Sequence, residues 1–321
     1  MARKKGTCVI IRSAHQRTEA SETLTLIAPH LGEALSLLAA LIWAASVVLF
    51  RMSGRSFAPF ALNLFKNTIA TLLFLATFAV LRENLFRPAP PLDYILLALS
   101  GVIGIAVADT VFFRSLNIVG AGPSQIVNLS YSPFVILFSW IFLGERLTPG
   151  DMVGAVLIIL GIFITSSRRP MTDVSPSEFR RGVGLATLSV ALMALGVILA
   201  KPVLDRSPVL WSTAVRLIAG LLALMALTAV SPKRRAVWRM FRPSSSWKVA
   251  IPAAVLGTYV AMLVWIAGMK YTQASTAAIL NQTSAVFVLP MAAVVLKEAI
   301  TARKIAAVVL AIAGVVLVTM R

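Results

Sequence analysis

The chain has 321 residues, of which 59% are hydrophobic and 13% are charged, and its formal net charge is +18. Soluble globular domains carry about a quarter charged residues, so this composition excludes an ordinary soluble protein. The positive charge could indicate a nucleic-acid-binding protein. However, the Lys and Arg residues form short clusters between apolar stretches, where they would meet anionic lipid headgroups. We therefore predict a lipid bilayer as a partner and no nucleic acid.

The sequence offers no ligand set for a metal or a cofactor. A single cysteine, Cys8, excludes a disulfide within the chain, and the two histidines, His15 and His30, form no metal-binding motif. No Walker motif is present, so we expect neither a cofactor nor a step driven by ATP. Residues 1–30 lack the continuous apolar core of a signal peptide, and we predict that they form a polar, basic tail.

Apolar stretches of about 20 residues follow this tail, and each is long enough to cross about 30 Å of hydrocarbon. Such stretches must be helical, because in lipid every backbone polar group has to be satisfied within the protein. We therefore predict an all-α integral membrane protein with ten transmembrane helices. In chain order they cover Leu31–Phe50, Pro59–Leu81, Tyr94–Leu116, Gly120–Leu143, Met152–Ser167, Gly182–Val203, Pro208–Val230, Trp247–Lys270, Ala274–Leu296 and Ala302–Met320.

The second five predicted helices repeat features of the first five. A shift of 150 or 153 residues pairs Lys66 with Arg216, Asn128 with Asn281, and Glu145 with Glu298. Unrelated apolar helices would not keep polar residues in register, so we predict two repeats, at residues 31–168 and 182–321, joined by a polar linker loop at 169–181. An odd number of helices in each repeat places the repeats in the membrane in opposite directions, as in many secondary carriers.

One stretch of the first repeat carries a recognisable signature. Between Ser115 and Ile164 it combines a small-residue helix start, a proline inside the helix, Pro133, and the motif Gly-Glu-Arg-Leu-Thr at residues 144–148. In these features it resembles the EamA-type proteins of the drug/metabolite transporter superfamily. A similar stretch runs from Ala274 to Val318 in the second repeat.

The second copy departs from the signature in two places. It reads Lys297-Glu298-Ala299 where the first copy has Gly-Glu-Arg, and its proline, Pro290, lies later than the position that matches Pro133. We therefore expect the two halves to bend differently. Because a helix proline removes a backbone hydrogen bond, we expect kinks at Pro133 and Pro290 and treat both as hinge candidates.

The resemblance implies a ten-helix carrier that works by alternating access around a cavity lined by both repeats. Members of the family move amino acids, nucleoside-like metabolites, drugs or sugar derivatives, and the resemblance does not choose among them. It also implies a multi-pass protein of the cell membrane with both termini in the cytoplasm. The Lys and Arg residues of the predicted loops weakly favour the opposite orientation.

Polar and aromatic side chains inside the predicted helices are candidates for the cavity lining. A buried amide is costly unless it is hydrogen bonded, so Asn128 and Asn281 should face the interior, as contacts between helices or as substrate ligands. Aromatic rings with a polar atom suit either a binding pocket or helix packing. The cavity candidates are Trp43, Asp109, Gln125, Asn128, Tyr131, Tyr259, Trp265, Asn281 and Gln282.

Among the charged residues of the predicted helices, we single out Lys66, Asp109 and Arg216 as candidates for a charge within the membrane. Long basic side chains often extend to the membrane surface, which is our ordinary interpretation of Lys66 and Arg216, and contact with an anionic group is the alternative. Asp109 lies far from the helix ends and should be protonated, paired or in contact with water. Lys66 and Arg114 are its candidate partners. Asp109 is either a structural group, a proton carrier or the counter-charge of a cationic substrate.

Gly154 and Gly161 lie on one helix face and favour close helix packing or a homodimer interface.

Other functions remain as alternatives to a carrier of small organic solutes. An integral-membrane enzyme acting on a lipid-linked substrate would need clustered acidic or His residues, whereas the Asp and Glu residues here are scattered. A receptor or scaffold would leave the duplication unexplained. We therefore predict a transporter, coupled to protons for export or exchange, and not an enzyme.

Overall fold

The computed structural model describes residues 30–144, 149–150, 152–154, 156–157, 160, 174–232, 234–272, 277 and 280–319. All regular structure within these ranges is helical, which confirms the expected all-α fold. Seven described helices are long and apolar enough to cross a membrane, as a multi-pass membrane protein requires. They cover Leu31–Ser53, Pro59–Leu81, Pro91–Val119, Ala121–Leu143, Pro176–Arg206, Val209–Val230 and Trp247–Tyr271.

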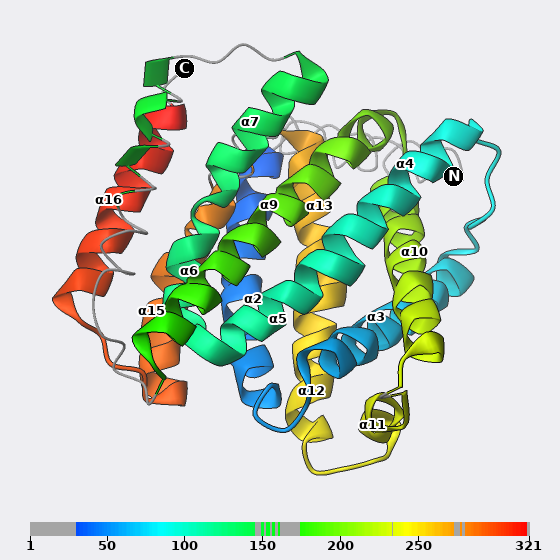
Figure 1. Ribbon diagram of the computed structural model, residues 1–321. Helices are drawn as coiled ribbons and strands as arrows, with labels where there is room; N and C mark the ends of the chain where they lie inside the picture. Colours follow the sequence, from blue (N-terminus) through cyan, green and yellow to red (C-terminus); the bar gives the residue numbers. More distant parts are fainter. Residues whose placement is uncertain are drawn as a thin grey trace, which may run out of the picture.

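The elements follow one another in a similar order in both halves of the chain (Figure 1). The first half contains α2 (Leu31–Ser53), α3 (Pro59–Leu81), α4 (Pro91–Gly101), η2 (Val102–Val107), α5 (Ala108–Val119), α6 (Ala121–Asn128) and α7 (Tyr131–Leu143). The second contains α9 (Pro176–Arg206), α10 (Val209–Val230), α11 (Arg234–Trp238), η3 (Arg239–Phe241), α12 (Trp247–Ala254), η4 (Val255–Val260), α13 (Ala261–Tyr271), α15 (Ser284–Leu296) and α16 (Ala302–Thr319). The helix predicted at 152–167 lies largely outside the described residues, as do Cys8 and Glu145.

A π-helical turn interrupts the third long helix of each half at equivalent positions. The two turns, η2 and η4, cover residues 102–107 and 255–260, and each contains a glycine, Gly104 or Gly257. Such turns are often found at functional sites. The wider turn changes the direction in which the neighbouring side chains point. Apolar periodicity predicts a regular helix here, so the sequence analysis missed both turns.

A helix break also recurs in both halves of the chain, and the expectation that they bend differently stays a prediction. The first break separates α6 from α7 at Ser130, and the second lies at Thr283, the equivalent position. In both, the side-chain hydroxyl donates to the carbonyl oxygen three residues earlier at 2.7 Å. Pro133 lies in the first turn after its break, whereas Pro290 lies inside α15. The second break therefore needs no adjacent proline.

The sixth predicted helix begins earlier than its apolar pattern indicated. Helix α9 starts at Pro176, where the sequence analysis expected a loop up to residue 181. The hydroxyl of Ser175 accepts a hydrogen bond from the backbone N–H of Glu178 at 3.3 Å, and a proline occupies the first turn. These are ordinary signals of a helix start, and they outweigh the polar composition of this segment.

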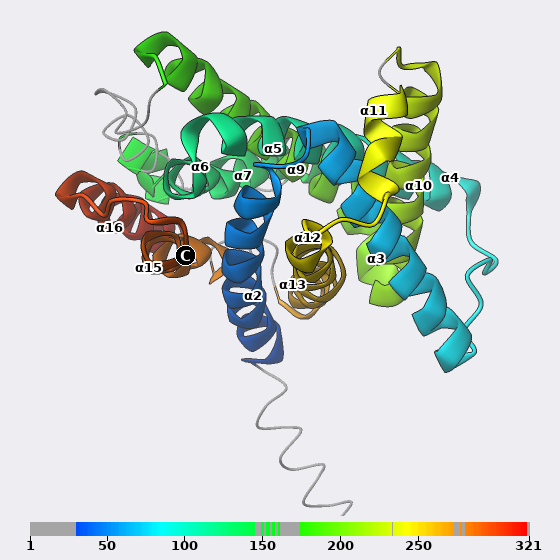
Figure 2. The same cartoon turned by 90° about the horizontal axis from the view of Figure 1, so that it is seen from below.

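The first helix of each half packs against the third long helix of the other half. Helix α2 packs along α12, η4 and α13 of the second half, while α9 packs along α4, η2 and α5 of the first. A close approach at Gly196 allows the second contact, since a Cβ atom there would lie 3.0 Å from the Cα of Gly104. In both views α15 and α16 lie at one side of the bundle and α3, α4 and α10 at the other (Figure 2).

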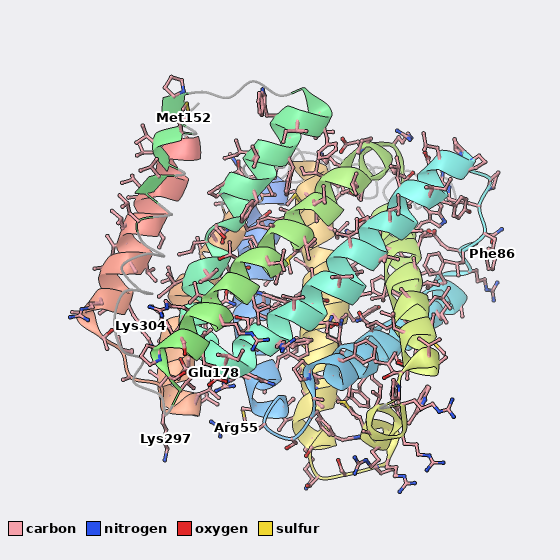
Figure 3. All side chains as sticks on the ribbon, in the orientation of Figure 1. Arg55, Phe86, Met152, Glu178, Lys297 and Lys304 are labelled. Carbon is pink, nitrogen blue, oxygen red and sulfur yellow. The ribbon has the colours of Figure 1, made fainter. Side chains whose placement is uncertain are left out.

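Several helices meet at one end of the bundle, where Figure 3 places Arg55, Glu178, Lys297 and Lys304. Arg51, near the end of α2, donates to the carbonyl of Asn117 near the end of α5 at 3.0 Å. Glu298, which follows α15, accepts hydrogen bonds from Ala121 and Gly122 at the start of α6, at 2.8 and 3.0 Å. Helix α2 ends at the end of the bundle where α9 begins, so these two helices run in opposite directions (Figure 3).

Candidate functional site

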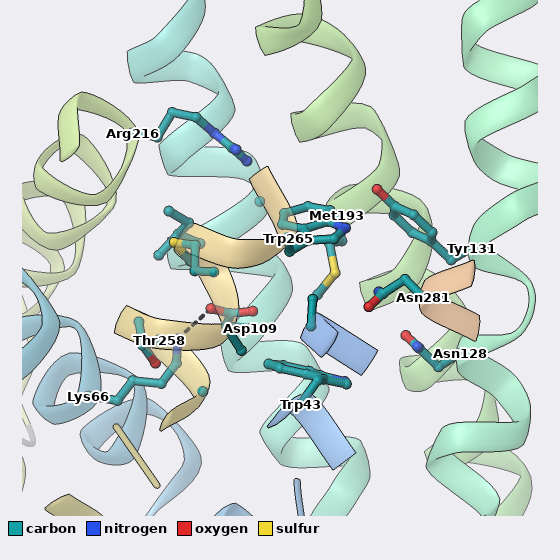
Figure 4. Close-up of a pocket in the computed structure, with 16 residues that line it drawn as sticks. Trp43, Lys66, Asp109, Asn128, Tyr131, Met193, Arg216, Thr258, Trp265 and Asn281 are labelled. Atoms are coloured by element: carbon teal, nitrogen blue, oxygen red, sulfur yellow. Dashed lines mark hydrogen bonds and ion pairs between the residues drawn. The ribbon is translucent and has the colours of Figure 1, made fainter. Parts of the chain in front are cut away.

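A pocket lies at the centre of the bundle, with walls from both halves of the chain (Figure 4). Its cavity volume is about 70 Å³, which is small beside the usual range of small-molecule sites. We refer to it as the central pocket. Eight residues singled out from the sequence line it: Trp43, Lys66, Asp109, Asn128, Tyr131, Arg216, Trp265 and Asn281.

Much of the lining comes in pairs from equivalent positions of the two halves. The pairs are Trp43 with Met193, Lys66 with Arg216, Gly104 with Gly257, Ile105 with Thr258, Asp109 with Met262, and Asn128 with Asn281. The central pocket thus lies where the repeated elements meet, close to both π-helical turns. Its chemistry is not symmetric, because the Asp109 carboxylate faces the central pocket where its partner in the second half is a methionine.

The carboxylate of Asp109 is paired with a lysine. Lys66 Nζ lies 2.6 Å from Asp109 Oδ2, and only 5% and 9% of the two side chains are exposed. The same ammonium group lies 5.7 Å from the ring centre of Phe113. Of the two partners that the sequence offered, the structure places Lys66 beside Asp109, and Arg114 is exposed. Extension of Lys66 to the membrane surface is therefore wrong, since a deep carboxylate holds its ammonium group inside.

Arg216 is buried in the central pocket and also does not extend to the membrane surface. Its helix, α10, packs on α4 so closely that a Cβ atom at Gly101 would collide with the Arg216 carbonyl, and this contact turns the arginine inward. Within the described ranges, Arg216 makes no ion pair with Asp or Glu, and its Nε has no hydrogen-bond partner. The arginine is therefore a buried cation without a carboxylate of its own.

Two aromatic residues bring further polar atoms to the central pocket. The rings of Tyr131 and Trp265 lie 6.3 Å apart at an interplanar angle of 59°. Neither the Tyr131 hydroxyl nor the Trp265 Nε1 has a hydrogen-bond partner among the residues the structure describes. Figure 4 shows Asn128 and Asn281 on the same side of the central pocket as Tyr131, across from Lys66. The central pocket thus presents hydrogen-bond donors and amide groups for which the described part of the chain supplies no partner.

Three cavity candidates from the sequence do not line the central pocket. The Tyr259 hydroxyl lies 2.5 Å from Thr77 Oγ1, and its ring packs on Phe74, so it joins η4 to α3 instead. Gln125 and Gln282 are buried and make long contacts across the helix breaks, with Ser284 at 3.5 Å and Ser132 at 3.4 Å. These polar groups join helices, because the faces that carry them turn toward neighbouring helices.

Sequence reasoning missed several residues of the lining. Met193 was not singled out, although the repeat shift aligns it with the candidate Trp43, so the alignment held a signal for it. Thr258 aligns with Ile105, an apolar residue that gave no signal. The hinge candidates Pro133 and Pro290 lie outside the lining. In the described part of the chain, no group of three or more His, Cys, Asp or Glu residues could hold a metal ion.

Comparison with known proteins places this architecture in context. An "Uncharacterized transporter" from Archaeoglobus fulgidus is 24% identical over 288 residues, which cover 88% of this chain and 96% of that protein. A solved structure titled "Crystal structure of protein" has a TM-score of 0.67 at 18% identity, over 90% of this chain and 96% of the other. This likeness concerns the fold alone.

The family comparison covers both halves separately. Residues 30–167 match the EamA-like transporter family, and residues 180–320 match it a second time. The matches include the helix breaks, the π-helical turns and every residue that lines the central pocket. The chain therefore belongs to the EamA-like transporter family, a family of membrane transporters.

Proposed function

We propose that the protein is a secondary transporter that moves small organic metabolites or drugs across the cell membrane by alternating access. The observation that carries this proposal is the central pocket, whose lining comes in equivalent pairs from both halves. A site between two related halves opens to either side of the membrane when one half rocks against the other. Buried charged residues inside spanning helices commonly mark such a pathway.

The proposed architecture is ten transmembrane helices in two inverted five-helix repeats, at residues 31–168 and 182–321, with a linker at 169–181. The opposite directions of α2 and α9 and the recurring breaks and π-helical turns support the inversion. An even number of spans puts both termini on one side, which we assign to the cytoplasm. A polar basic tail at residues 1–30 would then lie beside the anionic inner lipid surface.

Transport is coupled to protons in this proposal, as export or exchange, through Asp109. Its carboxylate is the acidic group of the described central pocket, and Lys66 holds it at 2.6 Å. A proton on Asp109 would remove the negative charge and free the lysine. Proton binding and solute binding would then act on the same few side chains, which is the linkage that a coupled carrier needs.

Uptake into proteoliposomes tests the proposal. The purified protein should move members of a labelled metabolite panel faster than protein-free liposomes do, and an imposed proton gradient should drive the movement. Asp109→Asn keeps the side-chain shape and removes its titration, so gradient-driven transport should be lost while solute binding persists. Asp205→Asn, at a carboxylate that is 52% exposed on α9, should behave as wild type.

Two outcomes would contradict different parts of this proposal. If no panel member moves faster than in protein-free liposomes, the protein is not a transporter of these solutes. If Asp109→Asn transports at the wild-type rate with unchanged pH dependence, Asp109 is a structural group and the coupling is wrong.

A further inference from the structure

The charges of the central pocket do not balance. Lys66 and Arg216 are cationic and Asp109 is anionic, so the described lining carries one excess positive charge. The lysine and the aspartate neutralise each other at 2.6 Å, which leaves the arginine. A buried cation without a partner is costly, and an anionic group on a bound molecule would remove that cost.

Three buried atoms of the lining can donate a hydrogen bond but have no described partner. Arg216 Nε, Tyr131 Oη and Trp265 Nε1 are buried in the central pocket, and no described residue accepts a hydrogen bond from them. Arginine and tryptophan nitrogens can only donate, so their partner must be an acceptor. Buried donors are nearly always hydrogen bonded in folded proteins, and three that line one pocket indicate a missing group with several lone pairs.

We infer that the solute of the proposed transport function is an organic monocarboxylate whose carboxylate binds Arg216, Tyr131 and Trp265. A planar carboxylate fits the fork of a guanidinium group and offers enough lone pairs for the hydroxyl and the indole as well. This inference rests on the proposed function and adds the chemical class of the substrate.

The charge balance also decides between carboxylate-bearing classes. A single negative charge neutralises the excess, whereas a phosphate dianion would exceed it. A zwitterion would need a second anion for its ammonium group, and Asp109 is already engaged with Lys66. The rest of the solute would lie against the Trp43 ring, while Asn128 and Asn281 can hydrogen bond to an uncharged polar substituent.

A matched series of probes tests the class. The series is 4-hydroxyphenylacetate, its amide and tyramine, which keep one body and change the end group from anion to neutral amide to cation. Binding to the purified full-length protein is measured by calorimetry in detergent. The carboxylate should bind about 10-fold to 100-fold more tightly than the other two, as expected for hydrogen bonds to a charged group.

Two arginine variants locate the carboxylate. Arg216→Gln should lower the affinity for the carboxylate about 10-fold to 100-fold and change the affinity for the amide little, since only the charged contact is lost. Arg114→Gln is the matched control, because Arg114 is an exposed arginine on α5 outside the lining, and it should bind as wild type. If Arg216→Gln does not fold, Tyr131→Phe removes one donor while keeping the ring. It should lower the affinity for the carboxylate and change the affinity for the amide little.

Several results would overturn the inference. They are equal affinity for the three probes, tighter binding of tyramine, no binding of the carboxylate at millimolar concentration, or unchanged carboxylate affinity in both Arg216→Gln and Tyr131→Phe. Uptake separates this inference from the transport proposal. Preferred uptake of amine or amide overturns the inference and supports a transporter, whereas Arg216-dependent binding without any uptake supports the inference and contradicts transport.

Discussion

The charged residues of the central pocket differ in what compensates them. The Lys66 ammonium lies against the Asp109 carboxylate, and each side chain is less than a tenth exposed. Breaking such a pair leaves the other charge buried alone, which costs more than the pair itself contributes. Arg216 forms no ion pair with a described carboxylate, and Asp109 acts on it only from beyond ion-pair distance. A residue of this kind is retained at an energetic disadvantage that a ligand can relieve.

Removing the lysine should therefore destabilise the protein strongly. We expect Lys66→Met to lower the free energy of unfolding by about 3–5 kcal/mol, because Asp109 is left as an unpaired buried charge. The control is Lys201→Met, which breaks a 2.5 Å pair with Asp205, a side chain that is 52% exposed. Its cost should stay below about 1 kcal/mol. Unfolding in mixed micelles measures both, and equal losses would show that burial of the Lys66 pair does not matter.

At the scale of helices, the fold depends on close approach between elements of different halves. The crossing of α9 with α4 and η2 is closest at Gly196, and Ser100 donates a hydrogen bond from its hydroxyl to the Gly196 carbonyl. Small residues at such crossings let helix backbones pack without an intervening side chain. This crossing also lies beside Gly104, which lines the central pocket, so its packing fixes the shape of the wall.

A pair of substitutions on one helix tests this contact. Gly196→Ala should destabilise the protein by about 1–3 kcal/mol, because the added methyl group would have to displace backbone atoms 3.0 Å away. Gly184→Ala lies on the same helix, α9, with no neighbour within 4 Å of the added atom. It should be neutral or stabilising by up to about 1 kcal/mol, owing to the higher helix propensity of alanine. The two unfolding temperatures should therefore move apart, and a parallel shift would contradict the packing argument.

For the whole molecule, orientation in the membrane follows from the number of spans and the side on which the chain begins. Our proposal puts both termini in the cytoplasm, against the weak preference of the loop charges. Because the protein has a single cysteine, Cys8, in the N-terminal tail, one thiol reports the side of that tail.

Labelling of Cys8 with a membrane-impermeant thiol reagent tests the orientation. We expect no labelling in intact cells and full labelling once the membrane is opened, and Cys8→Ser is the control for background. Labelling of intact, sealed cells would place the tail outside and show that the loop charges give the correct orientation.

Sequence by itself determined the class of the protein and its duplication. The length of an apolar stretch and the spacing of its polar residues are local properties, so the helices and the register that pairs Asn128 with Asn281 could be read directly. The same reasoning identified Asp109 as a deep carboxylate and named Lys66 as a candidate partner. These inferences needed only the cost of burying polar groups in lipid.

Tertiary structure alone decided which of these residues share one pocket. Whether a polar side chain faces the central pocket or a neighbouring helix depends on the rotation of its helix, and the packing partners set that rotation. Tyr259 illustrates this, because it lies next to Thr258 of the lining but reaches Thr77 on α3. The π-helical turns re-aim the side chains that follow them, and apolar periodicity carries no sign of such a turn. Arg216 likewise could be read as a surface anchor until the contact of α10 with α4 placed it inside.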